Sequence, residues 1–170
     1  MKILFGMPSK DSWGGPIASE PPFVEALRKN GVDCTEEVYV YGDKNKPTPI
    51  IERIQRVLKI AFCFRKILKT QHFDLIHLNT AFDLKTILRD SVSIFLMKPR
   101  KAKVFLKIHG SEAENFQETN FIIRFLINYL SKKVDGFGIH THEEKENFLR
   151  LGFDENKFYF DKNDGYNFTK

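Results

Sequence analysis

A histidine that follows an apolar run is the first residue whose type and position could do chemistry. The segment 104–108 leads directly into His109, Gly110 and Glu112. An imidazole at the end of a strand could donate to, or accept from, a ligand oxygen at neutral pH. The alternative is that His109 only satisfies a neighbouring carbonyl group. His77 lies inside another apolar run, so we expect it to be a hydrogen-bonded core residue.

Paired glycines follow the first apolar run of the chain. Gly14 and Gly15 stand in the loop 9–16, ahead of a helical pattern. They could bring bare backbone N–H groups against a phosphate near a helix N-terminus. The loop matches neither GxGxxG nor GxxxxGK[ST], so it supports neither a dinucleotide site nor a P-loop. A tight turn without a ligand is the alternative interpretation.

Metal-ligand residue types are present but their spacing does not favour a metal site. The segment 140–144 contains two histidines and two glutamates. Thr141 and Glu144 have the spacing of a helix capping box, which explains the segment better than a metal centre does. Cys34 and Cys63 are the only cysteines and form no CxxC pair. We therefore expect no metal ion, no disulfide framework and no cofactor.

The elements that must position these residues alternate between strands and helices. Strands alternating with helices indicate a parallel sheet with helices packed on its faces. The predicted fold is α/β, a Rossmann-like three-layer sandwich with a doubly wound, mostly parallel sheet, which binds ligands beyond the carboxyl ends of its strands. Strands are expected at 3–7, 75–78, 104–108, 137–139 and 158–160, with a weaker edge strand at 34–41, and helices at about 50–69, 83–98, 119–133 and 141–152.

The first helix contains two adjacent prolines. Because proline lacks an N–H group, Pro21 and Pro22 are expected in the first turn of this helix, with Ser19 as its cap. Phe23, Val24 and Leu27 would then face the core.

The charge of the chain is basic, and one helix carries much of the excess. The net charge is +5, which fits nucleic acid, an anionic membrane surface or a phosphate-bearing ligand. No nucleic-acid-binding motif is present, so we expect no nucleic-acid partner. The helix at 50–69 is expected to place one set of residues along a single stripe, namely Ile51, Ile54, Leu58, Ala61, Phe62, Arg65 and Leu68. A candidate membrane face, or else an ordinary solvated face, is formed by Arg53, Arg56, Lys59 and Lys66.

No apolar run approaches the ~20 residues that a membrane-spanning helix needs. The apolar run at the N-terminus is too short to be the hydrophobic core of a signal peptide. We therefore expect a cytoplasmic protein, with peripheral contact to the inner membrane face as an option.

Several short motifs follow one another along the chain. They are Ile3-Leu4-Phe5 with Gly14-Gly15, then Leu27 to Gly31, Phe73 to His77, Ile108-His109-Gly110, Val134-Asp135-Gly136, and Thr141 with Glu143-Glu144-Lys145. The combined order and spacing of these motifs resemble the N-terminal domain of family 4 glycosyltransferases, which have the GT-B fold. The likeness covers about residues 1–160, and 161–170 would be a tail or the start of an interdomain linker.

The resemblance implies an acceptor-side domain that faces a second, nucleotide-sugar-binding domain across a cleft. Gly14 and Gly15 would lie near the donor diphosphate, and His109 would contact the transferred sugar near the reacting carbon. Asn79 and Glu112 would line the cleft. The nucleotide-sugar would be the donor substrate, and the acceptor a saccharide or a lipid-linked saccharide.

The remaining cleft residues and the departures from the family pattern follow from the same resemblance. Gly110 and Thr141 would complete the cleft, with Thr141 at a position where serine is commoner. Pro21 and Pro22 fall where the family usually continues its first helix, which puts the length of the glycine loop in doubt. Because the donor-binding C-terminal domain is absent, we expect this chain alone to transfer no sugar. The alternative is a non-catalytic binding or interaction module on the same fold, in contact with a membrane surface.

Overall fold

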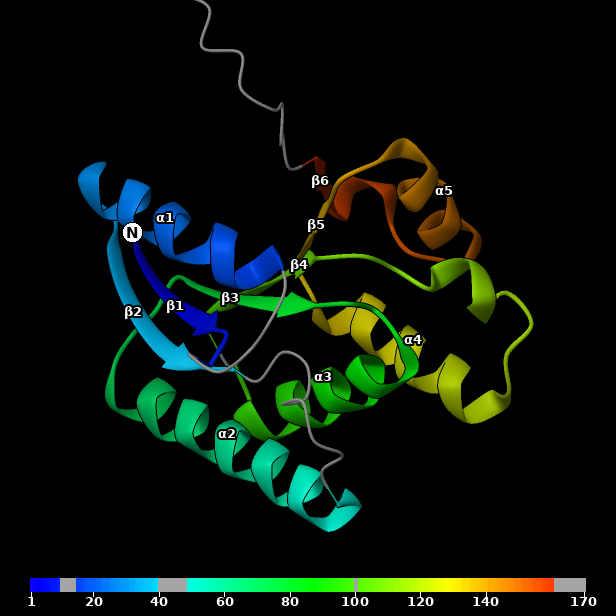
Figure 1. Ribbon diagram of the computed structural model, residues 1–170, viewed down its shortest axis with the longest axis horizontal. Coiled ribbons are helices and arrows are strands. Elements are labelled where there is room, and N and C mark those ends of the chain that lie inside the picture. Colours follow the sequence, from blue (N-terminus) through cyan, green and yellow to red (C-terminus); the bar gives the residue numbers. More distant parts are fainter. Residues whose placement is uncertain (10–14, 40–48, 100, 161–170) are drawn as a thin grey trace, which may run out of the picture.

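The computed structural model describes residues 1–9, 15–39, 49–99 and 101–160, and these fold around one sheet (Figure 1). The sheet has six strands in the order β2-β1-β3-β4-β5-β6, and every neighbouring pair is parallel. This confirms the predicted doubly wound α/β fold. The strands are β1 (Lys2–Met7), β2 (Asp33–Val38), β3 (Leu75–Thr80), β4 (Lys103–Ile108), β5 (Gly136–Ile139) and β6 (Phe158–Phe160).

Helices cover the two faces of the sheet unequally. In Figure 1, α1 lies alone on one side of the strands, while α2, α3 and α4 lie together on the other. The side of each helix follows from right-handed crossovers, because the chain moves one way from β1 to β2 and the opposite way from β2 to β6. The helices are α1 (Gly15–Lys29), α2 (Ile50–Thr70), α3 (Leu84–Met97), α4 (Phe121–Lys133) and α5 (His142–Arg150), with 3₁₀ turns η1 (Ala113–Phe116) and η2 (Glu155–Lys157).

Alternate residues of the strands supply two separate cores. On β1, Ile3 and Phe5 point toward α1 and pack with Val24, whereas Leu4 points into the larger core on the opposite face. That larger core includes Phe64 of α2. The period of two along each strand is what assigns neighbouring side chains to opposite faces. Side chains that alternate in this way on β3 and β4 build the site described below.

The prediction for the start of α1 was wrong. The helix begins at Gly15, so Pro21 and Pro22 lie inside it rather than in its first turn. Ser19 lies inside the helix, and its buried hydroxyl oxygen has no hydrogen-bond partner in the described residues, so it is not a cap. Interior proline costs about 3 kcal/mol of helix stability. Contacts made by the buried residues of α1 must offset this cost.

Side-chain caps begin two other helices, and the one at Thr141 was predicted from the sequence. Asp83 caps α3 by accepting from the Thr86 N–H at 2.7 Å, and Thr86 Oγ1 accepts in return from the Asp83 N–H. Thr141 caps α5 by accepting from the Glu144 N–H at 3.1 Å. Glu144 accepts from the His140 N–H at 3.0 Å, which completes the expected capping box.

Candidate functional site

The candidate site lies where β1, β3 and β4 end, at the carboxyl edge of the sheet. His109 follows β4 directly, and its N–H donates to the Thr80 carbonyl at 2.8 Å, which extends the ladder with β3 by one residue. The chain then turns at Gly110, whose φ of +93° lies in the region that only glycine adopts readily. The turn leaves the His109 side chain at the end of the strand, as predicted.

An amide side chain fixes the orientation of the His109 ring. Asn79, near the end of β3, uses its Nδ2 to donate to the Gly6 carbonyl of β1 at 3.2 Å. The Oδ1 atom of Asn79 then faces His109 Nε2 at 2.8 Å. Since Oδ1 can only accept, Nε2 of His109 carries a proton in this arrangement. Two of the residues expected in the cleft, His109 and Asn79, are thus in direct contact.

A buried carboxylate that the sequence analysis did not single out lies beside this pair. Glu20 of α1 is fully buried, with His77 and Lys107 each 3.3 Å from one of its oxygens and His109 Nε2 at 3.5 Å. Burial alone would raise the pKa of Glu20, but contacts with His109, His77 and Lys107 outweigh it and hold the pKa far below its usual range. Glu20 is therefore ionised at neutral pH.

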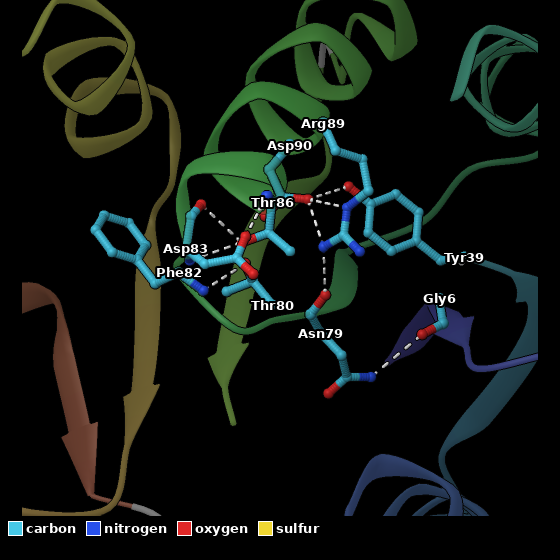
Figure 2. Close-up of polar contacts among 9 residues, drawn as sticks. All are labelled: Gly6, Tyr39, Asn79, Thr80, Phe82, Asp83, Thr86, Arg89 and Asp90. Carbon is cyan, nitrogen blue, oxygen red and sulfur yellow. Dashed lines mark hydrogen bonds and ion pairs between the residues drawn. The ribbon is translucent and has the colours of Figure 1, made fainter. Parts of the chain in front are cut away.

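The other side of Asn79 is held by a buried ion pair on α3, shown in Figure 2. Arg89 Nη2 donates to the Asn79 backbone carbonyl at 2.9 Å, and Arg89 Nε donates to Asp90 Oδ1 at 2.7 Å. The Tyr39 hydroxyl donates to the same Asp90 oxygen at 2.6 Å. Burial, together with the negative charge of Asp90, raises the pKa of the Tyr39 phenol well above its usual range. Tyr39, from the end of β2, is thereby tied to β3 through α3.

The turn between β3 and α3 is strained and tightly held. Phe82 has a φ of +47°, which is uncommon for a bulky residue. Its N–H donates to Thr80 Oγ1 at 3.2 Å, and its ring packs on Phe148 with centroids 4.6 Å apart. Its carbonyl accepts from the Glu112 N–H at 3.4 Å, so Glu112 is joined to this turn through its backbone. Figure 2 shows Thr80, Phe82 and the Asp83 cap side by side at this turn.

The other residues expected in the cleft lie around a neighbouring hollow or apart from it. Gly110 and Thr141 line a cavity of about 280 Å³ together with His140 and Glu143. The His140 ring lies 5.9 Å from that of His109, which connects the hollow to the Asn79 and His109 pair. The Glu112 side chain is exposed and is not part of this lining.

The two glycines of the first loop are only partly described. Gly15 is the first residue of α1, and a β-carbon there would meet nothing within 4 Å. Gly14 lies outside the described residues. An exposed glycine that opens a helix at the carboxyl edge leaves its backbone N–H accessible to an anion.

Metal ligation and membrane spanning were also assessed on the described part of the chain. Within residues 1–9, 15–39, 49–99 and 101–160, no group of three or more His, Cys, Asp or Glu side chains could hold a metal ion. Over the same ranges, each helix is too short or too polar to cross a bilayer.

Solved structures of another protein share this fold. Three structures of Anabaena Alr3699/HepE match the chain, one in complex with UDP-glucose, one with UDP and glucose, and one with UDP. Their sequence identities to this chain are 16%, 15% and 13%, with TM-scores of 0.54, 0.53 and 0.52. Each match covers 94% of this chain and 43% of the other, so this chain spans less than half the length of HepE.

No protein-family model matches the sequence, and no curated protein matches it. At identities of 13–16% the likeness to HepE shows the fold alone.

Proposed function

We propose that this chain is the N-terminal, acceptor-side domain of a GT-B glycosyltransferase similar to family 4, which moves a sugar from a nucleotide-sugar to a saccharide or lipid-linked acceptor. The observation that carries the proposal is the carboxyl-edge site, where His109 is held by Asn79 beside the turn at Gly110. The HepE structures that share the fold contain UDP or UDP-glucose, which supports a nucleotide-sugar as the donor.

Glycosyl transfer would require one role at the start of α1 and another at His109. In glycosyl transfer an acceptor hydroxyl attacks the anomeric carbon of the sugar while the nucleoside diphosphate leaves, so negative charge grows on the diphosphate. The backbone N–H group of Gly15, at the positive end of the α1 dipole, would stabilise that charge, and the resemblance gives Gly14 the same role. His109 would hydrogen-bond a hydroxyl of the transferred sugar and so orient it for attack.

The acceptor would occupy the hollow beside His109. The cavity of about 280 Å³ lined by Gly110, Thr141 and Glu143 offers hydroxyl, carboxylate and backbone groups for the hydroxyls of a saccharide. Glu112 would lie at the rim of this hollow. A second domain outside this chain would hold most of the nucleotide-sugar.

Transfer assays on this chain and on any longer product of the same gene test the proposal. We expect the longer product to bind and turn over a UDP- or GDP-sugar, and the purified chain alone to show no turnover. In the longer product, His109→Ala should reduce turnover by about 10²–10³-fold, the usual effect of losing one polar contact to a transition state. The matched control is His72→Ala, because the His72 side chain is 69% exposed. Equal activity of the two variants would contradict the role of His109.

We propose in addition that the layer formed by α2, α3 and α4 lies against an anionic membrane surface. On α2, the expected stripe is only partly buried, since Ala61 is fully buried whereas Ile51, Ile54 and Phe62 are 71%, 54% and 52% exposed. Packing against α3 sets the rotation of α2, so that Ala61 and Phe64 are its buried residues. The neighbouring helices α3 and α4 expose further apolar side chains, namely Leu84, Leu88, Phe95, Phe121, Ile122 and Phe125.

The charges of this layer favour an anionic partner. Lys59 and Lys66 of α2 are exposed, and Arg53 and Arg56 are half-buried, with Arg56 Nη2 3.3 Å from Glu52 Oε1. The sequence of α4 contains no acidic residue, and the one acidic residue of α3 is buried Asp90. Apolar side chains among exposed lysines are typical of surfaces that bind anionic lipid.

Vesicle sedimentation tests the membrane proposal. We expect the chain to bind vesicles that contain phosphatidylglycerol, and to bind more weakly to vesicles of phosphatidylcholine alone. Lys59→Glu with Lys66→Glu should abolish binding to the anionic vesicles. The control is Lys29→Glu on α1, which lies on the opposite face of the sheet (Figure 1). Binding that is insensitive to the lipid charge, or lost equally in the control, would contradict the proposal.

A further inference from the structure

Charged and titratable side chains are buried together beneath α1, at a depth where an apolar core would normally lie. Glu20 is 0% exposed, His77 is 5% exposed and Lys107 is 7% exposed. Removing charges from water is expensive, and well-packed apolar residues of similar volume often serve stability equally well. The role proposed above for His109 does not account for any of these three side chains.

The two oxygens of Glu20 have different surroundings. Oε2 faces His77 Nε2 at 3.3 Å, whereas Oε1 faces both Lys107 Nζ at 3.3 Å and His109 Nε2 at 3.5 Å. Lys107 therefore supplies the positive charge that balances Glu20. The oxygen that Lys107 holds is also the one that lies next to the candidate site.

Aromatic rings pack around His77 and Lys107 of this cluster. The His77 ring lies between Phe5 and Phe105, with centroid distances of 5.0 and 5.5 Å, and 5.7 Å from Phe23. Lys107 Nζ lies 5.2 Å from the centre of the Phe23 ring. Glu20 thus lies between its own helix and the side chains of β3 and β4, and among the described residues His77, Lys107 and His109 are the titratable groups that face it.

We propose that Glu20 is a positioning residue for His109. Together with Asn79, Glu20 holds the Nε2 edge of the imidazole ring inside the protein, and we call this arrangement of Glu20, Asn79 and His109 the clamp. Asn79 Oδ1 and Glu20 Oε1 both attract the proton on Nε2, so they fix the tautomer and the ring orientation together. In the neutral ring, Nδ1 would then be the atom that accepts a hydrogen bond from a sugar hydroxyl. This last step rests on the proposed function, whereas the clamp itself does not.

Nitrogen-15 NMR of the histidine rings tests the clamp directly on this chain. The His109 signals are assigned by their loss in His109→Asn. In the wild type we expect His109 to report protonation at Nε2 and not at Nδ1. Glu20→Gln should shift His109 toward a mixture of tautomers, and Glu25→Gln, an exposed change on the same helix that affects the pair with Lys29, should leave the signals unchanged. A folded Glu20→Gln variant with the wild-type tautomer would overturn the proposal.

A second variant covers the case in which Glu20→Gln does not fold. The double substitution Glu20→Gln with Lys107→Met removes both buried charges, and the same tautomer measurement applies to it with the same two outcomes. In a longer product that shows turnover, Glu20→Gln should lower kcat at least 10-fold with KM for the donor within twofold, and an unchanged kcat would contradict the step in which the clamped ring orients the sugar. A shifted tautomer, together with a longer product that binds no nucleotide-sugar, would support the clamp and contradict the proposed function.

Discussion

Removing one hydroxyl from the Tyr39, Asp90 and Arg89 network should have a measurable effect on stability. Tyr39→Phe keeps the ring, which packs edge-on against Phe64 with centroids 5.8 Å apart. It deletes only the O–H group that donates to Asp90 Oδ1 at 2.6 Å in a buried position. A hydrogen bond to a charged group contributes about 1.5–3 kcal/mol. Asp90 keeps Arg89 as its partner, so no uncompensated charge is created and the larger cost of a broken ion pair does not arise.

Urea denaturation followed by far-UV circular dichroism measures this loss. With a slope of about 2 kcal/mol/M, a loss of ~2 kcal/mol lowers the midpoint by roughly 1 M. The matched control is Tyr159→Phe, because Tyr159 is 57% exposed and its loss of a hydroxyl should change stability by less than about 0.5 kcal/mol. If Tyr39→Phe and Tyr159→Phe lower the free energy of unfolding by the same small amount, the hydrogen bond from Tyr39 to Asp90 does not contribute as the geometry implies.

Three further predictions follow from the strand ends, the caps and the buried carboxylate. Gly6→Ala would place a β-carbon 2.8 Å from Tyr39 Cβ, so it should cost about 1–3 kcal/mol of unfolding free energy, with the unhindered Gly15→Ala as control. Asp83→Ala removes the cap of α3 and should cost about 1 kcal/mol in the same urea assay. Because the folded pKa of Glu20 lies below its ordinary 4.5, its contribution is complete above that pH and is lost as pH falls below it. The stability difference between wild type and Glu20→Gln should therefore shrink between pH 7 and pH 3, and a constant difference would show that the Glu20 charge is not responsible.

Features set by a few neighbouring residues could be predicted from the sequence. The apolar run before His109 placed this residue at a strand end, and the spacing of Thr141 and Glu144 identified a capping box. Both depend on interactions within a few residues, where chain geometry leaves few alternatives. The α/β fold expected from the alternation of strands and helices is the fold that this chain shares with HepE.

Features that depend on packing between distant segments could not be predicted in the same way. The start of α1 was misplaced because proline preference was applied without the contacts that stabilise the helix around Pro21. The stripe expected on α2 was only partly right because apolar residues occur around much of the helix circumference, so periodicity alone could not say that Ile54 is exposed while Ala61 is buried. The burial of Glu20 could have been predicted, because Glu20 precedes Val24 and Leu27 by four and seven residues and so lies on the inward stripe of its helix. Its partners on β3 and β4 could not be assigned without the sheet register.

Asn79 connects the strands of the candidate site to the helices on the other face of the sheet. Its side chain connects β1, through the Gly6 carbonyl, to His109 at the end of β4. Its backbone carbonyl is held by Arg89, from the helical layer on the other face of the sheet. A shift of that layer would therefore move the carbonyl of Asn79 and, through its side chain, the imidazole of His109. If α2 to α4 do lie on a membrane, the Arg89 to Asn79 contact is the route by which that surface would influence the site, because it joins the layer to the His109 clamp by direct hydrogen bonds.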